Sequence, residues 1–157
     1  MSTMLKSTAP TVRLKEFHFP VAVEWTGGRC VAAHIEGKSA IQIAPPPVFR
    51  GTDPTLWSPE DLVVAAVASC LAITFTGLAA REDVAYENLS VEADGVAGTR
   101  HDGRFGFTRV GLRMSVQGAD REALRRLAER AEESCLVSAS LDLPVETVIE
   151  VNPRRPS

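Results

Sequence analysis

Three cysteine side chains are the groups in this sequence best suited to carry out chemistry. Cys30, Cys70 and Cys135 lie far apart in the chain, and no Cys-x-x-Cys pair occurs. The three histidines are equally scattered, so a structural zinc site is not expected. A thiolate can attack an electrophile, but a free cysteine is also among the most buried residue types. Each thiol could therefore be a reactive group or a small apolar side chain in a packed interior.

The charge and the motifs of the chain exclude several classes of function. Seventeen basic and twenty acidic residues give a net charge of −3, and no basic cluster stands out, so nucleic-acid binding is not expected. Neither a Gly-x-Gly-x-x-Gly motif nor a phosphate-binding loop is present, so nucleotide binding has no support. No metal or cofactor is expected.

The element that must position Cys70 is the apolar segment Leu62–Ala80, which has nineteen residues and no charged side chain. Ser58-Pro59-Glu60-Asp61 before it is a strong helix start, with a capping serine, proline in the first turn and two acidic residues facing the helix dipole. A membrane span needs about twenty predominantly apolar residues. Six alanines and several polar residues weaken that interpretation, and neither flank is basic. We therefore predict a helix to about Ala80, buried at the centre of the fold and against a second subunit.

Alternating patterns before and after this helix predict strands. The N-terminal part suggests a half-buried antiparallel meander followed by an extended, proline-rich loop over 45–57. Two strands follow the helix, and then a second amphipathic helix with a stripe that ends at Cys135. The segments are TVRLKEF, PVAVEWT, CVAAHIEG, AIQIA, NLSVEAD, RFGFTRVGLRMSVQG, ADREALRRLAERAEESC and a final strand ETVIEVN. This order favours an α+β fold. We expect a disordered arm over 1–10, one domain over 11–152 and a tail over 153–157.

Cys70 and Cys135 both lie on the apolar faces of the two long helices. These helices must pack together or on the same sheet, so the two thiols could meet, although spacing alone does not prove it. Cys135 falls where the second helix stops, and a thiol at such a junction can be both packed and mobile.

The block SPEDLVVAAVASC, followed by SCLVSASL about sixty-five residues after its cysteine, resembles the OsmC/Ohr family of organic hydroperoxide reductases. The first cysteine of that family lies in a pattern like (N/S)PE-x-L-(x)7-C, and the similarity runs from about Thr11 to Val151. The resemblance implies an OsmC-like fold, with antiparallel sheets packed on two long helices, a buried central helix and an intertwined homodimer.

The resemblance also implies roles for individual residues. Cys70 would be the peroxidatic thiol, Cys135 the resolving thiol, and Glu60 the family's glutamate. The family's arginine would be Arg50, ten residues before Glu60 as in OsmC-like members, or Arg29 in a Gly-Gly-Arg turn as in Ohr-like members; we favour Arg50. The substrate would be a small organic hydroperoxide, and an external dithiol of lipoyl or thioredoxin type would reduce the disulfide.

Physical reasoning adds a constraint to this set. Apolar walls favour the protonated thiol, so Cys70 needs a nearby cation, and an arginine fork can also hold peroxide oxygens. Glu60 and Cys70 are ten residues apart in one helix, about 15 Å along its axis. They can hardly meet within one chain, so we expect each active site to be shared between two subunits. Candidate apolar walls that would favour organic peroxides are Val63, Val67, Phe105, Phe107 and Met114.

Some features leave alternatives open. The segment LVSASLDLP after Cys135 differs from the Pro-Tyr-Ser-Asn type of run in Ohr proteins. Cys30 has no role in the family pattern and is expected to be a strand residue. A dimeric small-ligand-binding or redox-sensing protein of the same fold is the alternative function. A thiol hydrolase would need a histidine base, for which no motif is present. Residues 1–11 lack the apolar core of a secretory signal, so a cytoplasmic location is expected.

Overall fold

The computed structural model describes residues 15–154, so the proposed arm over 1–10 and the last part of the tail lie outside the described residues. The order of elements is the predicted one, with two short helical turns added. It runs β1 (Ala22–Gly27), β2 (Cys30–His34), β3 (Ile41–Ile43), a 3-10 turn (Pro47–Phe49), α1 (Pro59–Arg81), β4 (Asn88–Thr99), β5 (Phe105–Gly118), α2 (Arg121–Glu133), α3 (Leu136–Ala139) and β6 (Val145–Pro153).

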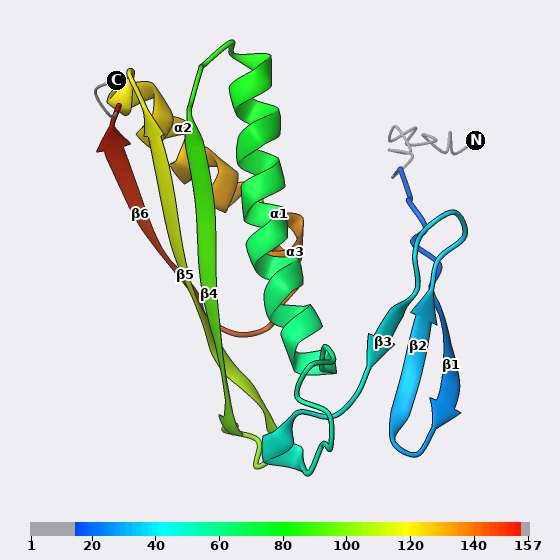
Figure 1. Ribbon diagram of the computed structural model, residues 1–157. Helices are drawn as coiled ribbons and strands as arrows, with labels where there is room; N and C mark the ends of the chain where they lie inside the picture. The colour runs from blue at the N-terminus through cyan, green and yellow to red at the C-terminus, as the bar shows by residue number, and fades with distance from the viewer. Residues whose placement is uncertain (1–14, 155–157) are drawn as a thin grey trace, which may run out of the picture.

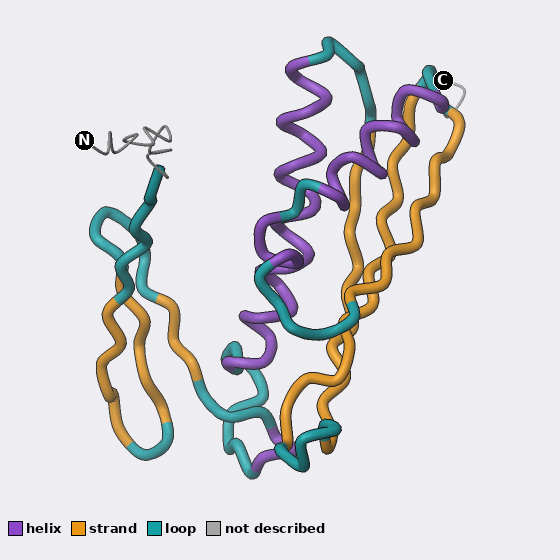
Figure 2. The backbone as a smooth tube through the Cα atoms, turned by 180° about the vertical axis from the view of Figure 1, so that it is seen from behind, coloured by secondary structure: helices purple, strands orange, loops and turns teal. Residues whose placement is uncertain are grey.

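One sheet and two helices form the main body of the chain. The sheet has the order β4-β5-β6, and both long helices lie on the same side of it (Figures 1 and 2). β4 and β5 are antiparallel, but β5 and β6 are parallel. The expected antiparallel pairing is therefore found everywhere among the described strands except between β5 and β6. Because α2 and α3 form a crossover between β5 and β6, the chain returns to the starting end of the sheet before the last strand begins.

The core lies between this sheet and the helices, and the predicted faces are confirmed. Alternate residues of β5 are buried while Arg109 and Arg113 between them are exposed. The stripe of α2 faces the same interior, as expected for an amphipathic helix. The buried residues of these two faces are Val110, Leu112, Met114 and Val116 on β5, and Leu124, Leu127, Ala128 and Ala131 on α2.

The start of α1 follows the sequence prediction. The Ser58 hydroxyl accepts a hydrogen bond from the Asp61 N–H at 3.0 Å, and the Asp61 carboxylate accepts one from the Ser58 N–H at 2.8 Å. This reciprocal capping box satisfies two backbone donors that would otherwise lack partners. The helix ends at Arg81, one residue beyond the predicted end.

α1 is buried on one side only. Its interior side chains are Val67, Leu71, Phe75, Leu78 and Ala79. The opposite side presents Ala66, Ser69, Gly77 and Ala80, together with Ile73, which is 69% exposed. By length and hydropathy α1 could cross a membrane, yet it packs along the sheet and supplies much of the core. The helix forms where it was predicted, but within the described part of the chain its second face is uncovered, so the buried central position stays a prediction.

The N-terminal sheet stands apart from the main body (Figure 1). β1, β2 and β3 form the predicted antiparallel meander. However, the apolar side chains expected on the inner face of β1 are exposed, including Trp25 at 73% and Val23 at 59%. Residues 15–17 of the first predicted strand segment are not in a strand, and 11–14 lie outside the described residues. Within one chain, only the second sheet packs on the helices.

The second predicted helix is shorter than expected. α2 ends at Glu133, with Ser134 as its C-cap, so Cys135 lies outside it. Cys135 is instead the residue that precedes the short helix α3. This break turns the chain away from the direction of α2 while keeping the Cys135 side chain in the interior.

Candidate active site

Cys70 and Cys135 come together from two different elements. Cys70 projects from α1 beside the buried stripe and is partly exposed, whereas Cys135 is 1% exposed at the junction of α2 and α3. Both thiols are free, and Cys70 lies near enough to Cys135 to help lower the pKa of the Cys135 thiol. The contact that the sequence left open is therefore present in the fold.

The surroundings of Cys135 favour its thiolate. Burial raises the pKa of this thiol, because a charge is costly away from water. The Ser138 hydroxyl, which donates a hydrogen bond to the sulfur at 3.1 Å, and the Ser138 N–H act in the opposite direction. The Cys70 thiol and the Val137 N–H add to this lowering. The net result is a pKa for Cys135 below its ordinary value.

Arg29 and Glu60 line one cavity at the N-terminal end of α1. A cavity of about 460 Å³ between the N-terminal sheet and the start of α1 is lined by both residues. The Arg29 guanidinium donates hydrogen bonds to the carbonyl oxygens of Phe49, at 2.9 Å, and Arg50, at 3.4 Å. The Glu60 Oε2 atom is buried, and it has no hydrogen-bond partner among the described residues. The carboxylate thus lines the same cavity as a positively charged group, without an ion pair or hydrogen bond between them.

Arg50 is placed less favourably than Arg29. It ends the 3-10 turn with left-handed backbone geometry (φ 62°), its residue is exposed, and it does not line the cavity that contains Glu60. Its contact with Arg29 is made by its backbone carbonyl oxygen, which accepts a hydrogen bond from the Arg29 guanidinium. The arrangement therefore favours Arg29, the alternative in the sequence analysis, over Arg50. The signal for Arg29 was its Gly-Gly-Arg turn.

Four of the five candidate residues form two separate pairs within one chain, and Arg50 belongs to neither. Cys70 faces Cys135, and Arg29 shares a cavity with Glu60. Glu60 lies in the first turn of α1 and Cys70 near its middle, so the length of helix between them keeps the pairs apart.

A larger apolar groove of about 830 Å³ runs along α1 and the lower part of the sheet. It begins at Glu60, and its wall includes Phe107, one of the candidate apolar residues. Gly95 allows α1 to approach the sheet there, since a Cβ at this position would lie 2.4 Å from Val64 Cγ2. Val67 and Met114 are instead fully buried in the core.

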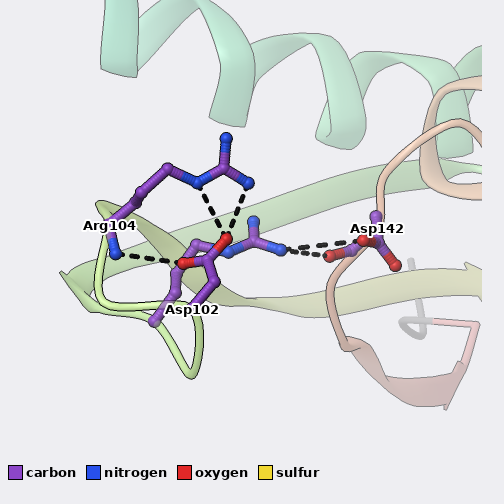
Figure 3. A network of polar contacts seen from close by, with 4 residues as sticks. Asp102, Arg104 and Asp142 are labelled. Carbon is purple, nitrogen blue, oxygen red and sulfur yellow. Dashed lines mark hydrogen bonds and ion pairs between the residues drawn. The ribbon is translucent and has the colours of Figure 1, made fainter.

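The tip of the β4–β5 hairpin contacts both the loop after α3 and the 3-10 turn whose carbonyl groups bind Arg29. Arg100 donates to the Asp142 carbonyl oxygen at 3.1 Å in the loop after α3, and the Asp142 carboxylate lies 3.7 Å away (Figure 3). Asp102 and Arg104 pair within the tip, which lowers the pKa of Asp102. The ring of Phe105 packs edge-on against Phe49 at 6.0 Å, beside the carbonyl that holds Arg29.

No group of three potential metal-ligating residues occurs within 15–154. Cys30 begins β2 opposite Gly27 and is partly buried, which agrees with its expected place in a strand. The prediction that no cofactor is needed rests on the chemistry of the thiols.

Comparisons with known proteins agree with this architecture. The family model for OsmC-like proteins matches residues 51–150. The Bacillus subtilis (strain 168) protein YmaD is 27% identical over 146 residues, covering 88% of this chain and 96% of its own. Among solved structures, an OsmC-like protein from Vibrio cholerae has a TM-score of 0.77 at 23% identity, with coverage of 85% and 99%. An organic hydroperoxide resistance protein from Elizabethkingia anophelis has a TM-score of 0.67 at 19% identity, with coverage of 90% and 100%.

The fold and the family model together define the class: the chain is an α+β protein that belongs to the OsmC-like family. Some structural neighbours in this family are named organic hydroperoxide resistance proteins.

Proposed function

We propose that this protein is a thiol-dependent peroxidase that reduces organic hydroperoxides to alcohols. The observation that carries the proposal is the meeting of Cys70 and Cys135, two free thiols from separate elements, in a chain of the OsmC-like family. A structural role for buried cysteines does not require them to contact each other. The names of the hydroperoxide resistance proteins among its structural neighbours point to the same substrate class.

The proposed cycle needs only the thiols and an external reductant. The Cys70 thiolate attacks the hydroxyl-bearing peroxide oxygen, the O–O bond breaks, and the alkoxide leaves, taking up the proton that the Cys70 thiol had released to give the alcohol. Cys70 becomes a sulfenic acid, and Cys135 condenses with it to form a disulfide and release water. An external dithiol then reduces the disulfide by exchange. The net reaction consumes one hydroperoxide and one dithiol.

Arg29 and Glu60 are proposed to complete the site across a subunit boundary. The arginine would stabilise the thiolate and hold the peroxide, and the carboxylate would orient its fork. Because this pair is separated from Cys70 within one chain, it would serve the Cys70 of the partner subunit. The uncovered face of α1 and the exposed apolar side chains of the N-terminal sheet support a homodimer that covers both.

Disulfide mapping tests the proposal directly. The reduced protein is treated with one equivalent of an alkyl hydroperoxide, alkylated and digested, and its cross-linked peptides are identified by mass spectrometry. We expect a Cys70–Cys135 bond, absent in Cys70→Ser and retained in the matched control Cys30→Ser. Free thiols after treatment, or a bond that requires Cys30, would contradict the mechanism.

The apolar groove along α1 favours a second candidate function, the binding of a small apolar ligand or redox sensing without turnover. In that case the disulfide would form at most once per chain, and adding a dithiol would not sustain peroxide consumption. A steady-state assay with dihydrolipoamide or a thioredoxin system separates the two functions. The cytoplasmic location stays a prediction.

A further inference from the structure

Ser138 makes a side-chain contact with Cys135 that the proposed cycle does not yet use. Its hydroxyl lies 3.1 Å from the sulfur and donates to it, and the residue is partly buried. Two positions on, Ser140 uses its hydroxyl differently, donating to the Leu136 carbonyl at 2.8 Å. Of these two serines in the segment after Cys135, only Ser138 bonds to the sulfur.

We propose that Ser138 is a positioning residue that makes Cys135 the leaving sulfur when an external dithiol opens the Cys70–Cys135 disulfide. This inference rests on the proposed function and concerns its reductive half. It predicts that the reductant bonds to Cys70 first and that Cys135 is released as a thiolate held by the Ser138 hydroxyl.

The step balances as a thiol–disulfide exchange. A thiolate of the reductant attacks Cys70 Sγ, forming a new S–S bond, and the bond between Cys70 and Cys135 breaks with its electron pair going to Cys135. The second thiol of the reductant then attacks its own sulfur in the mixed disulfide and releases Cys70. The dithiol is oxidised by two electrons, and both protein sulfurs are reduced.

Access favours attack at Cys70. Cys135 is almost completely enclosed, whereas Cys70 is partly exposed, so an incoming thiolate reaches Cys70 more readily. Exchange is also faster when the sulfur that leaves forms the more stable thiolate.

The electrostatic surroundings of Cys135 agree with this role. Burial raises the pKa of Cys135, and the Ser138 hydroxyl makes the largest opposing contribution. The Ser138 and Val137 N–H groups of α3 and the Cys70 thiol of α1 make smaller contributions, and each lowers the pKa.

The test compares disulfide reduction rates in matched serine variants. The disulfide is formed with diamide, so that its formation does not depend on peroxidase activity, and its reduction by dithiothreitol is followed by quenching and alkylation. A hydrogen bond to a charged group contributes enough that Ser138→Ala should slow reduction by roughly tenfold. Ser140→Ala should match the wild type, and Ser138→Thr, which keeps the hydroxyl, should recover most of the rate. Equal rates in Ser138→Ala and wild type would overturn the proposal.

Two further readouts separate positioning from a structural effect. A monothiol such as 2-mercaptoethanol, quenched early with iodoacetamide, should leave its adduct on Cys70 and the alkyl group on Cys135; the reverse pattern would refute the proposal. In a Cys70→Ser background, the pH profile of Cys135 alkylation should move to higher pH with Ser138→Ala but not with Ser140→Ala, and an unchanged profile would also refute it. A disulfide that forms with diamide but never with hydroperoxide would refute the peroxidase function while leaving these measurements decisive for Ser138.

Discussion

Arg29 follows a two-glycine turn, and this position explains how a surface arginine comes to line the same cavity as Glu60. Gly27 and Gly28 adopt positive φ values of 129° and 55°, which most side chains disfavour. The turn directs the chain so that the guanidinium reaches the carbonyls of the 3-10 turn and lines the cavity next to Glu60. Two fixed acceptors hold the fork, so its remaining donors can serve a substrate.

At this scale we predict that Arg29→Ala lowers kcat/KM for an alkyl hydroperoxide by about 100-fold, the loss typical of removing one preorganised stabilising group. Arg50→Ala is the matched variant and should retain most of the activity, because its side chain is outside the cavity. Steady-state kinetics with a saturating dithiol measure both. A larger loss for Arg50→Ala than for Arg29→Ala would return the role to Arg50.

Among the elements, α1 and α2 are joined at their ends by an ionic cluster. Glu82, the C-cap of α1, pairs with Arg130 and, at 3.2 Å, with Arg126 of α2. The hydrogen bond from Arg130 lowers the pKa of Glu82, burial opposes this, and Arg126 adds to the lowering. A carboxyl with a depressed pKa stabilises the folded state above its unfolded pKa, and this contribution is lost as the pH falls through the folded value.

Glu82→Gln should therefore unfold at a lower urea concentration than the wild type at pH 7. The difference should shrink as the pH falls below 4.5, the ordinary pKa of the group, and should vanish once Glu82 is protonated in both states. Urea titrations from pH 7 to acid, at one protein concentration, measure this. Glu129→Gln, an exposed change on α2, serves as the control. A constant difference across pH would contradict the ionic explanation.

For the whole molecule, the separation of the Cys70–Cys135 pair from the Arg29–Glu60 pair defines which catalytic groups each subunit of a dimer would supply. If Arg29 and Glu60 of one chain serve the Cys70 of the partner subunit, a chain that lacks one pair can still supply the other. Cys70 and Cys135 are contributed together by one chain, so the resolving step would not cross the boundary.

Mixed dimers test this arrangement. Glu60→Ala and Cys70→Ser chains, co-expressed with different affinity tags and purified through both, should regain activity because one of the two sites then contains Glu60 and Cys70 intact. Each variant alone should be nearly inactive. Sites confined to single chains predict no recovery, and that outcome would refute sharing. Wild-type dimers carrying the same two tags set the scale for full activity.

Local patterns predicted the parts of the fold that depend on neighbouring residues. The Ser58 cap, the buried face of β5 and the stripe of α2 follow from periodicity and capping, which are properties of short segments. Features that depend on contacts between distant segments could not be predicted from the sequence patterns. The parallel pairing of β6 and the detached position of the first sheet depend on how the chain crosses over, not on any one segment.

In the candidate site too, local sequence patterns predicted some features, and others depend on tertiary contacts. Sequence spacing placed both thiols on apolar helix faces, and the OsmC-like motif indicated the glutamate, but the placement of the two candidate arginines depends on the conformation of the loop over 45–57. That loop is held by tertiary contacts such as the edge-on packing of Phe49 on Phe105, which no local pattern encodes. Cys135 was expected inside α2, yet the helix ends two residues earlier at Glu133.

The detached N-terminal sheet also has a consequence for biosynthesis. Its three strands are complete at Ile43, so 114 of the 157 residues remain to be added once Ile43 has been incorporated. At usual elongation rates this takes on the order of ten seconds, during which Val23 and Trp25 have no interior of their own to enter. Among the described residues, the outer edge of β1 pairs with no further strand, and unpaired edges recruit other strands. A nascent chain of this protein thus depends on early shielding, and its yield should fall when synthesis outruns the supply of chaperones.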